Sequence, residues 1–247
     1  MQLMREKNKT EVRVPVNEFA NIMGYCEYRL LPLLKGKELP QTKTMKKGKE
    51  KHEREEEKEE ELYEFKPITL EELKDIEAEI EFKREGVYTR LLKKQGNFLF
   101  LYHGRVDKIF TKHKTLFIEE DKFVKNPKKY DKMDVAFLDQ RLQNVLYAIS
   151  KFDLDGSFDP ENWFSMPQKK RVCIIRIKPM NKQMNKKTGE YPDYKIFKVE
   201  IDENLKKILK DKMKRFQNLV LGKELPEHHN NPNKCKACQF DCEYRLK

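Results

Sequence analysis

The spacing of apolar and polar positions divides the chain into helical ends and a central region of strands. Near the N-terminus, residues 16–35 carry apolar side chains at Phe19, Ile22, Met23 and Leu30. Steps of three, one and seven residues place these side chains on one face of a helix. The pattern therefore predicts a helical segment whose apolar face packs on the rest of the protein.

The pattern changes at Val87, where short apolar or alternating runs replace the helical spacing. Gln-Gly-Asn and Thr-Lys-His-Lys lie at two of the junctions between these runs, and both have turn-forming composition. Alternating strands joined by short turns pair as antiparallel hairpins. The predicted strands of this sheet are 87–92, 98–102, 105–110 and 115–123.

Helices and strands alternate in the second half. Residues 133–152 have helical spacing, and the β-branched runs 171–177 and 195–201 are typical of strands. Asp202 is placed to cap a basic amphipathic helix that extends to about Leu221. We therefore predict an α/β (α+β) fold in which a mixed sheet core is flanked by helices.

We expect residues 1–247 to form a single domain, with the catalytic sheet core over residues 87–201. The charged run 46–64 has opposite charges three and four residues apart, which favours an exposed helix. Thr69 and Glu72 have the spacing of a capping box and predict the start of another helix.

Composition narrows the class of protein. The chain has 15 Phe and 10 Tyr among 247 residues, enough aromatic side chains for a folded core. No apolar run approaches the roughly 20 residues that a membrane span needs. The charged N-terminus lacks the apolar core of a signal peptide. We expect a soluble cytoplasmic protein without a membrane partner.

The net charge of +11 lies mostly after residue 123. A basic half suits a polyanionic partner, because each phosphate that is neutralised releases condensed counterions. A lysine-rich surface that serves only solubility is the alternative. The basic residues that are candidates for tracking a nucleic-acid backbone are Lys169, Lys170, Arg171, Lys206, Lys207, Lys210 and Arg215.

Two adjacent predicted strands carry candidate chemistry. Asp107 lies in Gly-Arg-Val-Asp, and Glu120 is followed two residues later by Lys122. Side chains alternate along a strand, so Glu120 and Lys122 project to one side. Carboxylates suit Mg²⁺ or Mn²⁺, and a lysine beside them can orient water and offset charge in phosphodiester hydrolysis. An ordinary cross-strand ion pair is the alternative, and Glu119 competes with Glu120.

These motifs, taken with two others, resemble the PD-(D/E)XK nuclease superfamily, RecB-like branch, which includes the CRISPR-associated iron–sulfur exonucleases. The resemblance implies a restriction-endonuclease-like fold. It also implies metal ligands, a catalytic lysine, and a glutamine and tyrosine that lie against DNA or against that lysine. The matching residues, in chain order, are His52 in Gly48-x3-His52, Asp107, Glu120, Lys122, Gln143 and Tyr147; the carbonyl of Asp121 can complete the metal shell, and Gln140 competes with Gln143.

The resemblance further implies a function. It predicts a metal-dependent DNA exonuclease that uses Mn²⁺ or Mg²⁺ and acts on single-stranded DNA ends, 5′-to-3′. Its role would be prespacer trimming in CRISPR spacer acquisition, with the CRISPR integrase complex as partner. The alternatives are a non-catalytic DNA-binding scaffold of the same fold, a stand-alone repair or viral nuclease, and a zinc-dependent nucleic-acid adaptor. A scaffold needs none of the carboxylates.

Four of the five cysteines predict a second metal centre. Cys235, Cys238 and Cys242 form a compact triplet, and Cys26 lies far upstream. Four thiolates suit a tetrahedral Zn²⁺ site or a [4Fe–4S] cluster. The resemblance favours [4Fe–4S], although the spacing of three residues after Cys238 is shorter than is common in that family. Cys173 lies in a β-branched run and is expected in the core.

In either case the metal would tie the chain ends together. Segments 16–35 and 222–247 are expected to form this cysteine cluster jointly. Metal binding would then contribute directly to folding.

Overall fold

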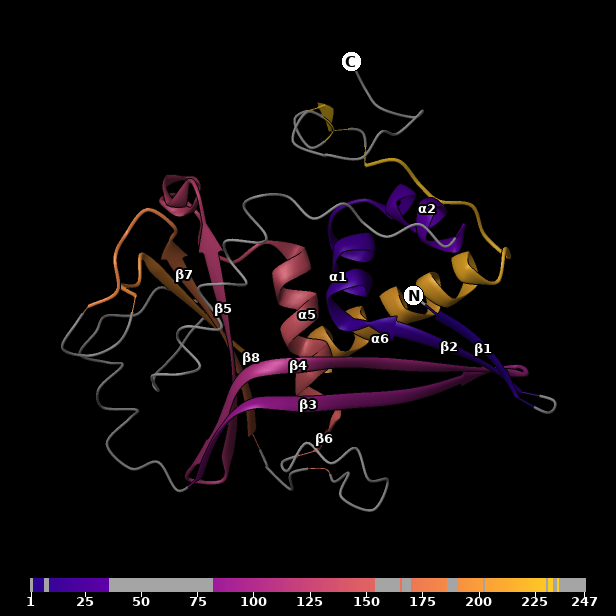
Figure 1. The fold of residues 1–247 in the computed structure, drawn as a ribbon, viewed down its shortest axis with the longest axis horizontal. Coiled ribbons are helices and arrows are strands. Elements are labelled where there is room, and N and C mark those ends of the chain that lie inside the picture. The colour runs from indigo at the N-terminus through magenta and orange to yellow at the C-terminus, as the bar shows by residue number, and fades with distance from the viewer. Residues whose placement is uncertain are drawn as a thin grey trace.

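The computed structural model describes residues 2–6, 9–35, 82–153, 165, 170–185, 191–201, 203–229, 231, 232 and 235, and structural statements refer to these. A long mixed sheet lies beside a group of helices in Figure 1. The strands are β1 (Gln2–Glu6), β2 (Lys9–Pro15), β3 (Phe82–Gln95), β4 (Phe98–Lys112), β5 (Thr115–Val124), β6 (Lys151–Asp153), β7 (Lys170–Pro179) and β8 (Lys195–Glu200).

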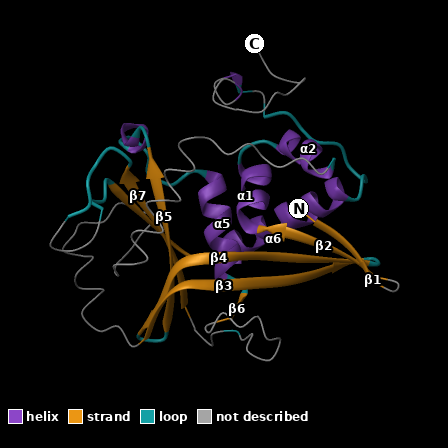
Figure 2. Cartoon of the chain, viewed as in Figure 1, coloured by secondary structure: helices purple, strands orange, loops and turns teal. Residues whose placement is uncertain are grey.

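The strand order is β1-β2-β4-β5-β7-β8, and β3 pairs with both β4 and β6. β2 runs parallel to β4 and β5 runs parallel to β7, whereas the other pairs are antiparallel. The described part of the chain thus forms one eight-stranded mixed sheet. Helices flank it (Figure 2). The predicted mixed α/β fold is confirmed.

The helices gather at the centre of the molecule. α1, α5 and α6 contact one another, and α5 also packs on β5 and β7. None of the helices in the described residues is long and apolar enough to cross a membrane. The helical elements are α1 (Val16–Gly24), η1 (Glu27–Arg29), α2 (Leu30–Leu34), η2 (Pro127–Tyr130), α5 (Leu138–Ala148) and α6 (Glu203–Val220).

The core lies between this helical group and the sheet. The ring of Phe19 on α1 packs edge-on against Tyr102 of β4 and Phe216 of α6, each with ring centroids 5.4 Å apart. All three aromatic side chains are fully buried. Burying them stabilises the contact between the first helix, the last helix and the sheet.

β4 changes its neighbour halfway along. One edge pairs with β3 over nearly its whole length, while the other pairs first with β2, up to His103, and then with β5, from Lys108 onward. Among the strands that the structure describes, none pairs with that edge between these two residues. β3 and β4 bend together here (Figure 1). Gly86 of β3, opposite Asp107 in the register, has a φ of 59°, which glycine adopts without steric cost.

Two expectations about strands and helices were wrong in detail. Segments 98–102 and 105–110 are one continuous strand, because His103 and Gly104 between them stay paired with β3. The helix predicted over 133–152 is only Leu138–Ala148, and the chain then enters β6. The sequence pattern also did not predict β1 and β2. The predicted helices in 46–64 and after Thr69 lie outside the described residues.

Candidate active site

Asp107, Glu120 and Lys122 lie together where β4 and β5 part. The Oδ2 atom of Asp107 accepts a hydrogen bond from the backbone N–H of Asp121 at 2.8 Å, which fixes that carboxylate against β5. Lys122 Nζ lies 2.6 Å from Oε1 of Glu120. Two residues apart on one strand, these side chains share a face, as the alternation of strand side chains requires.

Helix α5 supplies the other side of this group. The side-chain oxygen of Gln143 accepts a hydrogen bond from Lys122 Nζ at 3.0 Å, and its Nε2 atom donates to Glu120 Oε1 at 2.5 Å. The same amide donates to the hydroxyl of Tyr147 at 3.3 Å. Gln143 and Tyr147 are one helical turn apart and so lie on the same face of α5. The four side chains form one network between β5 and α5.

The side chains of Gln143 and Tyr147 are both buried. Gln143 is 9% exposed and Tyr147 only 3%. In this arrangement neither offers a surface on which a DNA base could stack, and both instead hold the lysine–carboxylate pair. Burial, together with the charge of Glu120, raises the pKa of Tyr147 well above 10.0, so the phenol stays neutral.

Lys122 carries a positive charge in this setting. Burial opposes that charge, but the carboxylates of Glu120, Asp107 and Asp139 outweigh it and raise the pKa of Lys122 above 10.5. Its ammonium therefore persists throughout the neutral and mildly alkaline range. Lys122 is suited to stabilising negative charge and unsuited to acting as a general base.

The structure separates Glu120 from the acidic residues beside it. Glu119 lies 3.3 Å from Arg176, and the carboxylate of Asp121 lies 2.5 Å from Lys178. Both of these ion pairs are almost fully buried on the other face of β5. Only Glu120 joins the network with Lys122, and Asp121 could contribute only its backbone carbonyl.

Gln140, the alternative to Gln143, has other hydrogen-bond partners. Its side-chain oxygen accepts a hydrogen bond from the backbone N–H of Phe137 at 3.3 Å, and its Nε2 atom donates to the hydroxyl of Tyr130 at 2.9 Å. It therefore satisfies a backbone donor at the N-terminus of α5. The amide that reaches Lys122 belongs to Gln143.

The donor set fits a hard divalent cation. The ammonium of Lys122 already lies against Glu120 and within the field of Asp107, so the group attracts positive charge. Carboxylate and carbonyl oxygens are the ligands that Mg²⁺ and Mn²⁺ prefer. His52, the predicted imidazole ligand, lies outside the described residues.

Gly104 lets Tyr147 approach the sheet. A Cβ atom at this position would lie 2.9 Å from the tyrosine ring and from its hydroxyl. We expect Gly104→Ala to displace Tyr147, to loosen Gln143, and to cost about 1–3 kcal/mol of stability through overpacking. Thermal unfolding measures this loss, and an unchanged melting temperature would contradict it.

The basic residues that the sequence offered as candidates for tracking a nucleic-acid backbone lie in different environments. The guanidinium of Arg215 bonds to Glu27, Glu224 and the carbonyl of Leu225, so its hydrogen-bond donors are directed to groups of this protein. Lys206 pairs with Glu203, and Lys170 with Glu200, on the surface. The guanidinium of Arg171 donates to the carbonyl of Ala148. Lys207 and Lys210 lie exposed on α6, and Lys169 is outside the described residues.

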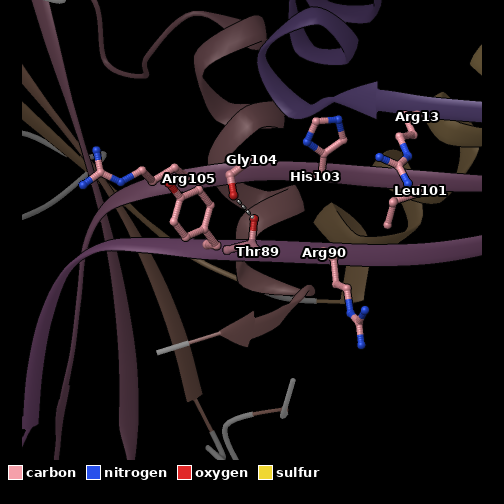
Figure 3. A pocket seen from close by; sticks show the side chains of 8 residues that line it. Arg13, Thr89, Arg90, Leu101, His103, Gly104 and Arg105 are labelled. Carbon is pink, nitrogen blue, oxygen red and sulfur yellow. Dashed lines mark hydrogen bonds between the residues drawn. The ribbon is translucent and has the colours of Figure 1, made fainter. Parts of the chain in front are cut away.

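A basic pocket that the sequence analysis did not identify lies on the β2–β4–β3 part of the sheet (Figure 3). It has a volume of about 560 Å³, and its lining includes Arg13, Arg90, Arg105 and His103. His103 and Arg105 alternate along β4 with residues that face the core, so they point to the opposite face. The guanidinium groups of Arg13, Arg90 and Arg105 point in different directions in Figure 3, and that of Arg105 donates to the carbonyl of Gly86 at 3.0 Å, so they do not converge on one point. In the sequence, this pocket could have been predicted from arginines that alternate with apolar residues in the strands.

The predicted four-cysteine cluster is only partly within the described residues. Cys235 is 5% exposed and Cys26 is half-buried, whereas Cys238 and Cys242 lie outside. The four-thiolate cluster therefore stays a prediction. Cys173 is fully buried in β7, and burial raises the pKa of its thiol well above 9.0.

Comparisons with known proteins give similarity of structure only. No protein-family model matches the chain, and no curated protein has a significant match to it. A crystal structure of SSO0001 aligns at 12% identity and a TM-score of 0.45, covering 99% of this chain and 90% of that one. The crystal structure named "Putative exonuclease" from Eubacterium rectale aligns at 9% identity and a TM-score of 0.42, covering 94% and 90%. At these values neither protein's function transfers to this chain.

Proposed function

We propose that this protein is a metal-dependent deoxyribonuclease that acts as an exonuclease on single-stranded DNA ends, 5′-to-3′. The observation that carries the nuclease proposal is the Lys122 ammonium, bonded to Glu120 and held in the field of Asp107 where β4 and β5 part. The preference for ends, the polarity and a role in prespacer trimming with a CRISPR integrase complex rest on the family resemblance of the motifs.

Each residue of the network has a task in phosphodiester hydrolysis. Asp107 and Glu120 would hold Mg²⁺ or Mn²⁺, with His52 and the carbonyl of Asp121 as further ligands. When bound, the metal polarises the phosphate and activates water. The Lys122 ammonium offsets negative charge that develops on the phosphate oxygens, as a fixed cation does without reorganisation.

Gln143 positions these groups. Its amide bonds to Lys122 and to Glu120 at once. If the lysine turned away from the carboxylate, it would lose its bonds to both Glu120 and Gln143. Tyr147 in turn bonds to that amide from a buried position. This support restricts the reactive side chains to one geometry, which is what converts binding energy into rate.

Removal of either carboxylate tests the proposal. We expect Asp107→Asn and Glu120→Gln to lower cleavage of single-stranded DNA by about 10³-fold, because a metal-held phosphate gains several kcal/mol of charge stabilisation. EDTA should abolish wild-type cleavage, and Mn²⁺ or Mg²⁺ should restore it. The measurement is the time course of degradation of DNA labelled at its 5′ or its 3′ end.

The same assay separates the competing functions. Asp211→Asn, an exposed carboxylate on α6, is the matched control and should cleave as the wild type does. DNA binding without cleavage under any metal would favour the scaffold. Release of the 5′ label first would support the proposed polarity, and loss of both labels through internal cuts would replace the exonuclease with an endonuclease.

A further inference from the structure

Two histidines and a cysteine converge near the C-terminal end of the described chain. The Sγ atom of Cys235 lies 3.7 Å from Nε2 of His228 and 3.8 Å from Nε2 of His229. The three ligand atoms all lie within 4.8 Å of one another. The thiol is 5% exposed and the imidazoles are half-buried. The group lies apart from the Asp107–Lys122 network in the sequence and uses none of its residues.

These separations are those of a tetrahedral zinc site. Zn–S and Zn–N bonds of about 2.3 and 2.0–2.1 Å, at a tetrahedral angle, put sulfur and nitrogen about 3.6 Å apart. The observed distances exceed this by only 0.1–0.2 Å. A thiol has one proton and can donate to one imidazole at a time, whereas a metal ion satisfies all three groups together.

A network of ion pairs fixes the segment that carries the histidines. The guanidinium of Arg215 on α6 bonds to Glu27 of η1 and to Glu224 beyond the helix, and the bond to Glu27 raises the pKa of Arg215. The backbone N–H of Glu227 also donates to Glu27, at 2.8 Å. The residue before His228 is therefore held against the segment that follows Cys26.

The N-terminal segment reaches the histidines directly. The ring of Tyr25 lies 6.3 Å from that of His229, and the ring of Tyr28 lies 5.7 Å from that of His228, measured between centroids. The segment around η1 therefore packs against both imidazoles, while the ligand atoms that converge are those of His228, His229 and Cys235.

We propose that His228, His229 and Cys235 bind one Zn²⁺ ion, with the fourth position of the tetrahedral shell left to a further ligand. Histidine nitrogen and cysteine sulfur are the usual donors of zinc sites, whereas a [4Fe–4S] cluster of the predicted kind takes four thiolates. The ion would join the segment that follows α6 to Cys235 and so contribute to folding. The inference does not depend on the proposed nuclease activity.

Metal analysis of the full-length protein tests this site. We expect the purified wild type to contain one zinc per chain and no iron or acid-labile sulfide. His228→Ala, His229→Ala and Cys235→Ala should each lose most of it. Chelation should lower the melting temperature of the wild type, because a structural metal contributes to folding. His113→Asn and Cys173→Ala, which change a histidine and a cysteine elsewhere, should retain the zinc.

Binding of Co²⁺ to the wild-type protein tests the site even if one of the variants does not fold. Wild-type protein that has been stripped of metal and given Co²⁺ should show the intense visible absorption of a tetrahedral site and a sulfur-to-metal charge-transfer band. Iron and sulfide that persist in both histidine variants would overturn the proposal in favour of the four-cysteine cluster. Absence of any bound metal after reconstitution with Zn²⁺ or Co²⁺ would overturn it as well.

Discussion

Replacing Lys122 by alanine is expected to lower the rate of DNA cleavage by about 10²–10³-fold, the usual cost of one preorganised charge-stabilising group. The side chain is bonded to Glu120 at 2.6 Å and to Gln143 at 3.0 Å, so its ammonium is fixed before any substrate arrives. Lys122→Ala should still bind DNA, because it removes one positive charge and leaves the exposed lysines of α6 unchanged. Single-turnover cleavage and a binding titration on the same DNA separate the two effects.

The pH dependence of protein stability, compared between the wild type and Lys122→Met, tests whether Lys122 carries a positive charge. The pKa of Lys122 is raised above 10.5, so its contribution to stability is complete below that unfolded-state value and is lost as the pH rises through the folded value. The difference in stability between wild type and Lys122→Met should therefore be constant from pH 7 to about 10, and should shrink at higher pH. Denaturant unfolding at several pH values measures this.

Lys94→Ala is the matched control for Lys122, because Lys94 is an exposed lysine on β3. It should cleave DNA at the wild-type rate. Full cleavage by Lys122→Ala would rule out the proposed role. A stability difference that declines already near neutral pH would show that Lys122 loses its proton there, which would contradict the proposed role of its positive charge.

The largest loss of stability is expected for Gly24→Ala. Gly24 ends α1, and a Cβ atom there would lie 2.4 Å from both the Cα and the backbone nitrogen of Asp139 on α5. Backbone atoms in a helix cannot rotate away as a side chain does, so the two helices must separate. Relief of such a clash costs about 3 kcal/mol or more, at the upper end of overpacking effects. Thermal or denaturant unfolding measures it.

The same substitution should also reduce cleavage, because α5 carries Gln143 and Tyr147. Gly96→Ala, in the turn between β3 and β4, is the matched control. Its φ is 58° and no other atom lies within 4 Å of its Cβ position, so it should lose only about 1–2 kcal/mol, the cost of a left-handed alanine. A loss for Gly24→Ala no larger than that for Gly96→Ala would contradict the predicted clash between α1 and α5.

Local periodicity determined much of the site. Glu120 and Lys122 share a face because strand side chains alternate, and Gln143 and Tyr147 share a face because they are one helical turn apart. Both relations follow from local backbone geometry and do not depend on the rest of the fold. The predicted α6 agrees with the structure to within a residue or two at each end for the same reason.

Tertiary pairing decided which of these faces meet. β2 and β5 both pair with one edge of β4, and Asp107, which lies between the two paired stretches, accepts a hydrogen bond from the backbone N–H of Asp121. No local pattern specifies this change of partner, because the partners of a strand come from distant segments. Arg215 illustrates the same limit, since its ion pair with Glu27 joins residues that are 188 positions apart.

The sequence by itself thus determined which side chains share a face on each element, because helix and strand geometry are local. It also supplied the carboxylates, the lysine and the cysteines. Only the tertiary structure decided that Glu120 rather than Glu119 meets Gln143, and that His228 and His229 lie beside Cys235. Those contacts depend on how distant segments pack, and packing depends on the burial of the whole core.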